Sequence, residues 1–193
     1  MDYTALGFKC GLEVHRQLST RKLFCDCPSL VNDPHPSNII IRRKLRASRG
    51  ETGRFDTAAE FEEKKNRYFI YEGASSSTCL VELDEQPPKD VNKEALETAL
   101  QIAKLLRCET ADQIQFMRKT VIDGSNTSGF QRTALIGIDG FIETSKGRVG
   151  IQTLCLEEEA AKKIEETKDY VKYRLDRLGD NNHFHHHQRY CHG

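Results

Sequence analysis

Residues 133–144 read TALIGIDGFIET, two runs rich in apolar and β-branched residues on either side of Asp139-Gly140. Asp-Gly tolerates the positive φ angles of a type I′ turn, and β-branched residues favour strands. The stretch therefore predicts an antiparallel β-hairpin with its turn at Asp139-Gly140.

Further strands are predicted on both sides of this hairpin, from alternation with the period of a half-buried strand and from apolar runs. They lie at residues 7–18, 68–71, 78–85, 113–119 and 148–156. In the first of them Glu13 and His15 share one face, whereas Leu12 and Val14 share the other.

Helices are predicted to cover the sheet. Residues 92–106 repeat Ala and Leu at helical spacing and begin with Asn92 as the N-cap. Charged segments at 56–68 and 158–170 are also predicted to be helical. The basic run IRRKLRASRG at 41–50 is interpreted as an exposed loop. The order of these elements predicts an α+β fold, mainly an antiparallel sheet with covering helices.

The size and charge of the chain limit its class. Its 193 residues suffice for one main domain, and 29 basic against 29 acidic side chains give a formal charge of zero. Balanced charge creates no global field that attracts nucleic acid or a membrane, so any RNA contact must be local. The sequence shows no signal peptide and no apolar run long enough to span a bilayer, which predicts a cytoplasmic protein without a membrane partner.

Seven cysteines at irregular spacing predict free thiols and not a disulfide framework. Cys25 and Cys27 could supply half of a zinc site, but no second CxC or CxxC pair follows them. Because structural zinc usually takes four protein ligands, two ordinary thiols are the preferred interpretation.

Two segments carry side chains that suit a hard cation. Glu13 and His15 are about 6–7 Å apart along a strand, so both can reach one ion. Glu157, Glu158 and Glu159 follow a predicted strand, and a cation there would relieve their mutual repulsion. The alternatives are an ordinary polar strand face for the first pair and, for the triplet, acidic residues that complement a helix dipole.

Residues 118–133, RKTVIDGSNTSGFQRT, combine glycines, hydroxyl groups and cations. Backbone N–H groups of such a loop can approach an anion closely while Arg118, Lys119 and Arg132 neutralise it, so phosphate is the expected ligand. The spacing matches neither the Walker A nor the Rossmann pattern, and an ordinary polar loop remains an alternative. Taken with the carboxylates, this loop indicates metal-assisted phosphoryl transfer.

Six strings resemble, in order and spacing, the N-terminal region of the E subunit of archaeal glutamyl-tRNA(Gln) amidotransferase. They are GLEVHRQL at 11–18, KLFCDCPS at 22–29, TCLVELDEQPP at 78–88, MRKTVIDGSNTSGFQRT at 117–133, LCLEEEAAK at 154–162 and YRLDRLG at 173–179. The chain is also similar, less closely, to the homologous B subunit of bacteria and organelles. The resemblance implies a catalytic cradle domain with a fold similar to that of glutamine synthetase, which agrees with the α+β prediction.

The resemblance also implies an ATP- and Mg²⁺-dependent ligase. In this family the E subunit binds glutamyl-tRNA(Gln) and phosphorylates the glutamyl γ-carboxylate. Ammonia from an asparaginase-like D subunit then displaces the phosphate, so the full-length protein is implied to work in a hetero-oligomer. The implied metal ligands are Glu13, His15, Glu157 and Glu158. The implied catalytic cations are Arg118 and Lys119, and the implied nucleotide or acyl-phosphate contacts are Ser125, Asn126, Ser128 and Arg132.

After residue 179 the sequence departs from the family. The family continues with a strand that carries another glutamate ligand, whereas here DNNHFHHHQRYCHG follows and Phe184 takes the place of that glutamate. We expect a partial cradle domain at 1–179, a disordered tail at 180–193, and little or no transamidation by the isolated chain. Two alternatives remain: a fragment that keeps only the surface for the D subunit, and a metal-binding module. The module would use His183, His185, His186 and His187.

Overall fold

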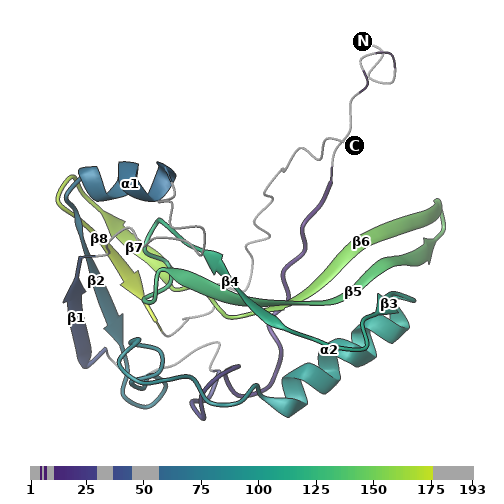
Figure 1. Cartoon of the computed structure of the whole chain (residues 1–193), viewed down its shortest axis with the longest axis horizontal. Helices are drawn as coiled ribbons and strands as arrows, with labels where there is room; N and C mark the ends of the chain where they lie inside the picture. The colour runs from purple at the N-terminus through teal and green to yellow at the C-terminus, as the bar shows by residue number, and fades with distance from the viewer. Residues whose placement is uncertain (1–4, 6, 8–10, 30–36, 45–56, 176–193) are drawn as a thin grey trace. The chain divides into compact units, whose positions relative to one another are not determined.

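The computed structural model describes residues 5, 7, 11–29, 37–44 and 57–175 (Figure 1). The chain divides into two compact units, Thr20–Leu178 and a smaller unit formed by Met1–Ser19 with Gly179–Gly193. The helices and strands found in the described residues all belong to the larger unit.

The strand predicted at 7–18 is wrong for residues 11–18, which form neither strand nor helix. A strand needs a partner to complete its backbone hydrogen bonds, and none of the described strands pairs with this segment. The tail predicted at 180–193 lies outside the described part of the chain.

One four-stranded sheet has the order β1-β2-β8-β7. Its strands are β1 (Ile39–Arg43), β2 (Tyr68–Gly73), β7 (Lys162–Glu166) and β8 (Tyr170–Arg174). The β1–β2 and β7–β8 pairs are antiparallel, whereas β2 and β8 are parallel neighbours. Alternate residues of β2 and β8 form its buried cluster, Phe69, Tyr71, Val171 and Tyr173. The strand predicted at 68–71 is confirmed, and helix α1 (Thr57–Lys64) confirms most of the one predicted at 56–68.

The second sheet is built on one long strand, β5 (Phe130–Thr144). Three strands pair with it antiparallel: β3 (Glu109–Thr110), β4 (Phe116–Thr120) and β6 (Gly147–Glu157). Thr133 and Ala134 pair with β4 and β6 at the same time, so these two strands lie on opposite edges of β5. Strands β4 and β6 confirm the predictions at 113–119 and 148–156.

Helix α2 (Lys93–Leu105) packs against the second sheet through small residues, Ala95, Ala99 and Ala103. Its predicted N-cap is confirmed, because Asn92 Oδ1 accepts a hydrogen bond of 3.2 Å from Ala95 N. This bond satisfies one of the N–H groups left without a partner at a helix start.

The β-hairpin predicted at 133–144 is wrong, because both of its runs belong to the single strand β5, which forms a hairpin with β6 instead. Asp139 and Gly140 lie within β5, Gly140 pairs with Ile151, and the chain reverses at Ser145 and Lys146. Asp139 has a positive φ of 54°. A Cβ at Gly140 would lie 2.4 Å from the Sγ of Cys108, so the absence of a side chain at this glycine serves close packing and not a turn.

Three further predictions are wrong because tertiary contacts override local propensity. Residues 78–85, predicted as a strand, form consecutive turns. The helix predicted at 158–170 does not form, and its middle part, residues 162–166, is strand β7, which the ladder with β8 holds extended. The basic run at 41–50 begins within β1, which pairs with β2, and its residues 45–50 lie outside the described part of the chain.

The described residues thus form the predicted α+β class, with mainly antiparallel sheets. The more specific cradle fold stays a prediction. Within the described segments, no helix has the length and apolar character needed to cross a membrane.

Candidate functional site

The 121–129 loop connects β4 to β5 and carries three of the predicted phosphate contacts. Val121 N donates to Gly129 O at 2.9 Å and closes the two ends of the loop. Asp123 Oδ1 accepts from Ser125 N at 2.9 Å and from Ser125 Oγ at 2.7 Å, which is an Asx-turn. Gly124 has a φ of +85°, in the region that favours glycine. Local bonds therefore hold this loop in one shape.

The hydroxyl groups of the loop all donate hydrogen bonds within the protein. Thr127 Oγ1 donates to the carbonyl of Glu82 at 2.5 Å, and Ser128 Oγ donates to that of Phe130 at 2.8 Å. Ser125 Oγ donates within the Asx-turn. A phosphate contact by Ser125 or Ser128 would exchange one of these bonds, and the predicted contacts remain predictions.

Asn126 is held differently from the hydroxyl residues. Its Nδ2 donates to the Glu159 carbonyl at 3.4 Å, whereas its Oδ1 is buried and has no hydrogen-bond partner among the described residues. This oxygen is an acceptor, so the bond that would satisfy it must come from a donor such as water or an amino group.

The glutamates at the end of β6 point to opposite faces of the sheet, as successive residues of an extended chain do. Glu158 accepts two hydrogen bonds from Arg132. Its Oε1 accepts from Arg132 Nη1 at 2.7 Å, and its Oε2 accepts from the Arg132 backbone N at 2.9 Å. The two side chains are only 18% and 16% exposed. The Arg132 guanidinium also lies 5.4 Å from the centre of the Phe24 ring. The predicted metal ligand Glu158 and the predicted nucleotide contact Arg132 are therefore bonded to each other.

Glu157 approaches Lys119 and Thr133 on the opposite face. Its Oε1 lies 3.3 Å from Lys119 Nζ and accepts from Thr133 Oγ1, also at 3.3 Å. Register explains the meeting, since Thr133 is directly opposite Glu157 in the β5–β6 ladder and β4 runs along the other edge of β5. The second oxygen, Oε2, makes no hydrogen bond to the described residues, so it is available to a cation.

Thr133 is a residue of this group that sequence reasoning missed. Its position at the end of the string MRKTVIDGSNTSGFQRT was a signal, but nothing local shows that its hydroxyl reaches a carboxylate 24 residues further along the chain.

The remaining predicted residues lie in two other places. Arg118 pairs with Arg132 in the β4–β5 ladder, and its guanidinium is 5.6 Å from the centre of the Phe130 ring. Glu13 and His15 belong to the smaller unit, where His15 Nε2 is 3.9 Å from Glu13 Oε2. Their convergence with Glu157 on one ion stays a prediction.

A shielded ion pair next to the loop was also missed. Lys22 Nζ lies 2.6 Å from Glu82 Oε1 and donates to the carbonyl of Ser77 at 2.7 Å. Burial raises the pKa of Glu82, Lys22 opposes this shift, and the nearby carboxylates of Glu159 and Glu158 add to it. Lys22 therefore compensates negative charge that would otherwise destabilise this region.

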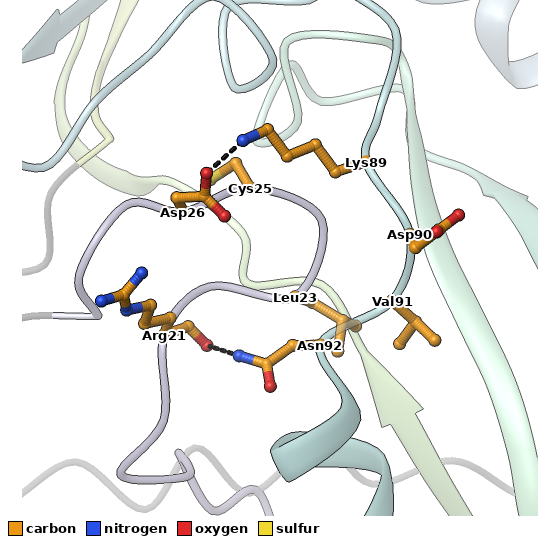
Figure 2. Close-up of a pocket in the computed structure, with 8 residues that line it drawn as sticks. All are labelled: Arg21, Leu23, Cys25, Asp26, Lys89, Asp90, Val91 and Asn92. Atoms are coloured by element: carbon orange, nitrogen blue, oxygen red, sulfur yellow. Dashed lines mark hydrogen bonds and ion pairs between the residues drawn. The ribbon is translucent and has the colours of Figure 1, made fainter.

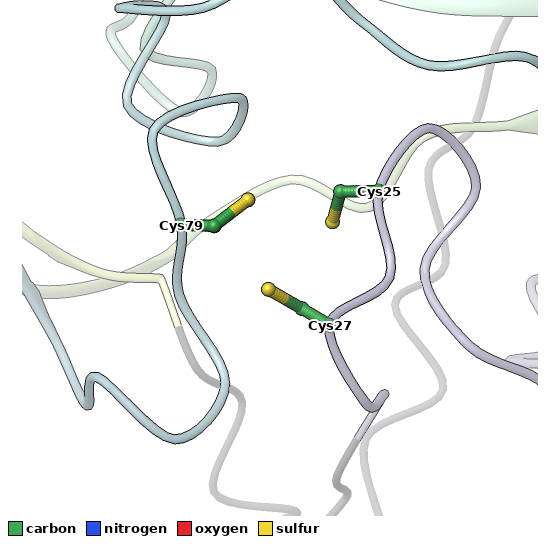
Figure 3. Close-up of side chains that lie close together, drawn as sticks. All are labelled: Cys25, Cys27 and Cys79. Carbon is green, nitrogen blue, oxygen red and sulfur yellow. The ribbon is translucent and has the colours of Figure 1, made fainter.

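Cys25, Cys27 and Cys79 come together although Cys79 is distant in the sequence (Figure 3). Their Sγ atoms all lie within 4.8 Å of one another. Among the residues that the structure describes, no other group of three or more His, Cys, Asp or Glu side chains is so placed. Burial raises the pKa of Cys25 to about 11 and raises that of Cys27 as well, so a metal ion would have to displace thiol protons.

Three thiols leave one position of a tetrahedral zinc site for a further ligand. Two ordinary thiols are the interpretation that the sequence favours, because Cys79 is not part of a second CxC or CxxC pair. The turns at 78–85 bring Cys79 to the other two thiols, and this contact is invisible in the spacing.

Contacts with the start of α2 fix the segment that carries Cys25 and Cys27, around a small cavity (Figure 2). Asn92 N donates to Leu23 O at 2.8 Å, and Asp26 forms an ion pair with Lys89. None of the predicted site residues lines this cavity. It is a structural junction that holds two of the three thiols.

The structure is thus a mixed α+β unit with a cation and a carboxylate on one sheet face, beside a glycine-containing loop. A family model described as the GatB/GatE catalytic domain matches residues 8–181, and the chain belongs to this family. The predicted family resemblance is confirmed.

Among similar proteins is the E subunit of the glutamyl-tRNA(Gln) amidotransferase of Methanococcus maripaludis, which is 56% identical over 179 residues. The corresponding protein of Archaeoglobus fulgidus is 53% identical over 180 residues. These alignments cover 92% and 93% of this chain and 28% and 29% of the two relatives. The chain thus spans less than a third of the length of these curated relatives.

Proposed function

We propose that this chain carries out the ATP-dependent step of a glutamyl-tRNA(Gln) amidotransferase, in which the γ-carboxylate of the tRNA-bound glutamate is phosphorylated. Family membership supports this proposal, because similar proteins are named for glutamyl-tRNA(Gln) and amide transfer. The structural observation that supports it best is the group of Lys119, Thr133 and Glu157, on the sheet face next to the 121–129 loop.

Phosphorylation is needed because a carboxylate is a poor electrophile for ammonia, whereas an acyl phosphate has a good leaving group. An oxygen of the γ-carboxylate attacks the γ-phosphorus of ATP, the bond to the β,γ-bridging oxygen breaks, and ADP leaves. Ammonia then attacks the acyl carbon, phosphate departs, and the nitrogen loses a proton. Cations beside the transferred phosphoryl group stabilise the charge in the transition state. Lys119 is the proposed cation on this face, whereas the other predicted contacts Arg118 and Arg132 are ladder partners on the opposite face of the sheet.

Mg²⁺ fits the second carboxylate oxygen of Glu157. This ion prefers carboxylate and water oxygens, and Glu157 Oε2 is available because Thr133 and Lys119 bind Oε1. When bound, the ion would neutralise phosphate charge. Glu13 and His15 stay predicted further ligands, whereas Glu158 lies on the opposite face of the sheet, bonded to Arg132.

The proposed assembly is a cytoplasmic hetero-oligomer with an asparaginase-like D subunit that supplies ammonia. Substrate carboxylate, ammonia and ATP must meet at one point, and the acyl phosphate must be kept from water until ammonia arrives. A separate ammonia-producing subunit meets this need if its product reaches the site without passing through solvent.

Binding of ATP with Mg²⁺ to the 193-residue chain, measured by calorimetry, tests the proposal. We expect Lys119→Met and Glu157→Gln each to weaken binding by about tenfold or more, because hydrogen bonds to charged groups contribute about 1.5–3 kcal/mol. Lys163→Met and Glu166→Gln are matched controls, since these residues form an exposed ion pair of 2.7 Å on the other sheet.

Equal affinities in site and control variants would contradict the proposed site. If the unmodified chain fails to bind ATP but copurifies with the D subunit, the alternative of a fragment with only a subunit-interaction surface gains support.

A further inference from the structure

Two tyrosines of the first sheet bind the backbone of the 121–129 loop, which belongs to the second sheet. Tyr173 donates its hydroxyl to the carbonyl of Asp123 at 2.6 Å, and Tyr71 donates to that of Gly124 at 2.7 Å. Tyr71 is 0% exposed and Tyr173 is 3% exposed. The mechanism described above uses neither of these buried hydroxyl groups.

The parallel pairing of β2 and β8 explains why both hydroxyls reach consecutive carbonyls. Tyr71 and Tyr173 are register partners, and their rings stack with centres 6.0 Å apart and planes at 23°. Because their side chains leave the sheet in the same direction, their hydroxyls end next to each other. Burial raises the pKa of Tyr71, so this hydroxyl keeps the proton that it donates.

The Phe69 ring adds a third contact at the same place. A Cβ built on Gly124 would lie 2.2 Å from Phe69 Cδ1, so the backbone rests directly on the ring. The positive φ of Gly124 is a second reason for glycine at this position. The first sheet therefore constrains the Asp123-Gly124 backbone from one side through two hydrogen bonds and a steric contact.

This arrangement fixes the direction of the peptide groups. In a trans peptide the carbonyl and the following N–H point in opposite directions. Since the carbonyls of Asp123 and Gly124 face the tyrosines, the N–H groups of Gly124 and Ser125 face away from the aromatic rings. Ser125 N indeed donates on that side, to the exposed Asp123 carboxylate at 2.9 Å.

We propose that Tyr71 and Tyr173 are positioning residues, which hold the 121–129 loop with the Gly124 N–H turned toward the phosphates of the bound nucleotide. This inference rests on the proposed function for the nucleotide. The two tyrosine hydrogen bonds to the loop, called the clamp below, rest on the geometry alone. Neither tyrosine touches the reacting atoms. Each acts through the peptide that its hydroxyl binds.

Tyr71→Phe, Tyr173→Phe and the double variant, all in the 193-residue chain, test the inference. Phenylalanine keeps the ring and removes only the hydroxyl. Tyr170→Phe is the matched control, because Tyr170 stacks on Tyr68 across the same two strands but donates to Glu165 and not to the loop. Val171→Ala is the control for general destabilisation, since Val171 belongs to the same buried cluster.

Amide hydrogen exchange within 121–129 is the primary measurement. We expect protection of the Val121, Ser125 and Gly129 amides to fall by about fivefold for each hydroxyl removed, the factor typical of one hydrogen bond. The affinity for ATP with Mg²⁺ should fall by a similar factor, about fivefold per hydroxyl. Val171→Ala should lower the melting temperature without a selective change in the loop, and Tyr170→Phe should change neither the loop nor the affinity.

Unchanged loop protection in the double variant would overturn the inference, as would a loss of protection no greater than in Val171→Ala. If loop protection falls but an ATP affinity present in the unmodified chain is unaltered, the positioning role is overturned. If the unmodified chain binds no ATP, the proposed function fails and the exchange data alone decide for or against the clamp. If the double variant does not fold, the two single variants give the same comparison.

Discussion

Lys22→Met provides the sharpest test of the electrostatics around the candidate site. Lys22 and Glu82 are 11% and 20% exposed, and methionine keeps the apolar stem of lysine while removing the charge. Glu82 would then remain shielded beside Glu158 and Glu159 without its counter-charge. Removing one partner of a buried ion pair costs about 3–5 kcal/mol, and the residual exposure of Glu82 favours about 3 kcal/mol at neutral pH. For a chain of this size that is a loss on the order of 6–12 °C in Tm.

The loss should depend on pH with a definite sign. Burial raises the pKa of Glu82 in the folded state, and removal of Lys22 raises it further. A carboxyl with a folded-state pKa above its unfolded value is protonated in the folded protein at low pH. The electrostatic penalty is therefore absent below the unfolded value of about 4.3 and is complete above the folded pKa. Loss of the Lys22 bond to the Ser77 carbonyl leaves a smaller contribution of about 1 kcal/mol that does not depend on pH.

Thermal unfolding followed by circular dichroism between about pH 4.5 and pH 8 measures this difference. Lys163→Met is the control, because Lys163 and Glu166 form an exposed ion pair for which about 0–1 kcal/mol is expected throughout this pH range. Adding Glu82→Gln to Lys22→Met should remove most of the pH dependence. A loss in Tm that is the same at both ends of the pH range, or no larger than in the control, would refute the reasoning.

Three other substitutions test the packing, the helix cap and the thiol group. Gly140→Ala should lower the free energy of unfolding by about 1–3 kcal/mol in urea denaturation, because its Cβ would clash with Cys108 and Leu106, whereas Gly150→Ala has open space and should be nearly neutral. Asn92→Ala should cost about 1 kcal/mol in the same assay, since the α2 N-cap is lost; no loss would show that the cap bond is replaced by water. Zn²⁺ should raise the Tm of the chain measured by scanning fluorimetry, and Cys79→Ser should abolish this increase. Cys155→Ser is the control, because Cys155 is exposed, and this variant should leave the increase unchanged. An equal increase in both variants would exclude the three-thiol group as the zinc site.

The order of the amino acids alone specifies those features that depend on near neighbours. Helix α2 follows from the spacing of Ala and Leu with Asn92 three residues before its capped N–H, and β2, β4 and β6 follow from apolar runs and alternation. Membership of the family is also legible in the sequence, because long strings such as MRKTVIDGSNTSGFQRT match it without any fold. The same strings contain Lys119 and Glu157, but not the fact that these two side chains meet.

Contacts between distant segments determine the other features, namely where β5 and β7 extend and which side chains meet at the site. Asp139-Gly140 suits a turn locally, yet its packing against residues 106–108 keeps it inside β5, and pairing with β8 keeps the charged residues of β7 extended. The thiol of Cys79, the hydroxyl of Thr133 and the two tyrosines on the loop reach partners that are 24 to 54 residues away. Such contacts leave no local pattern, because their free energy depends on where folding brings the partners together and not on the residues beside them in the chain.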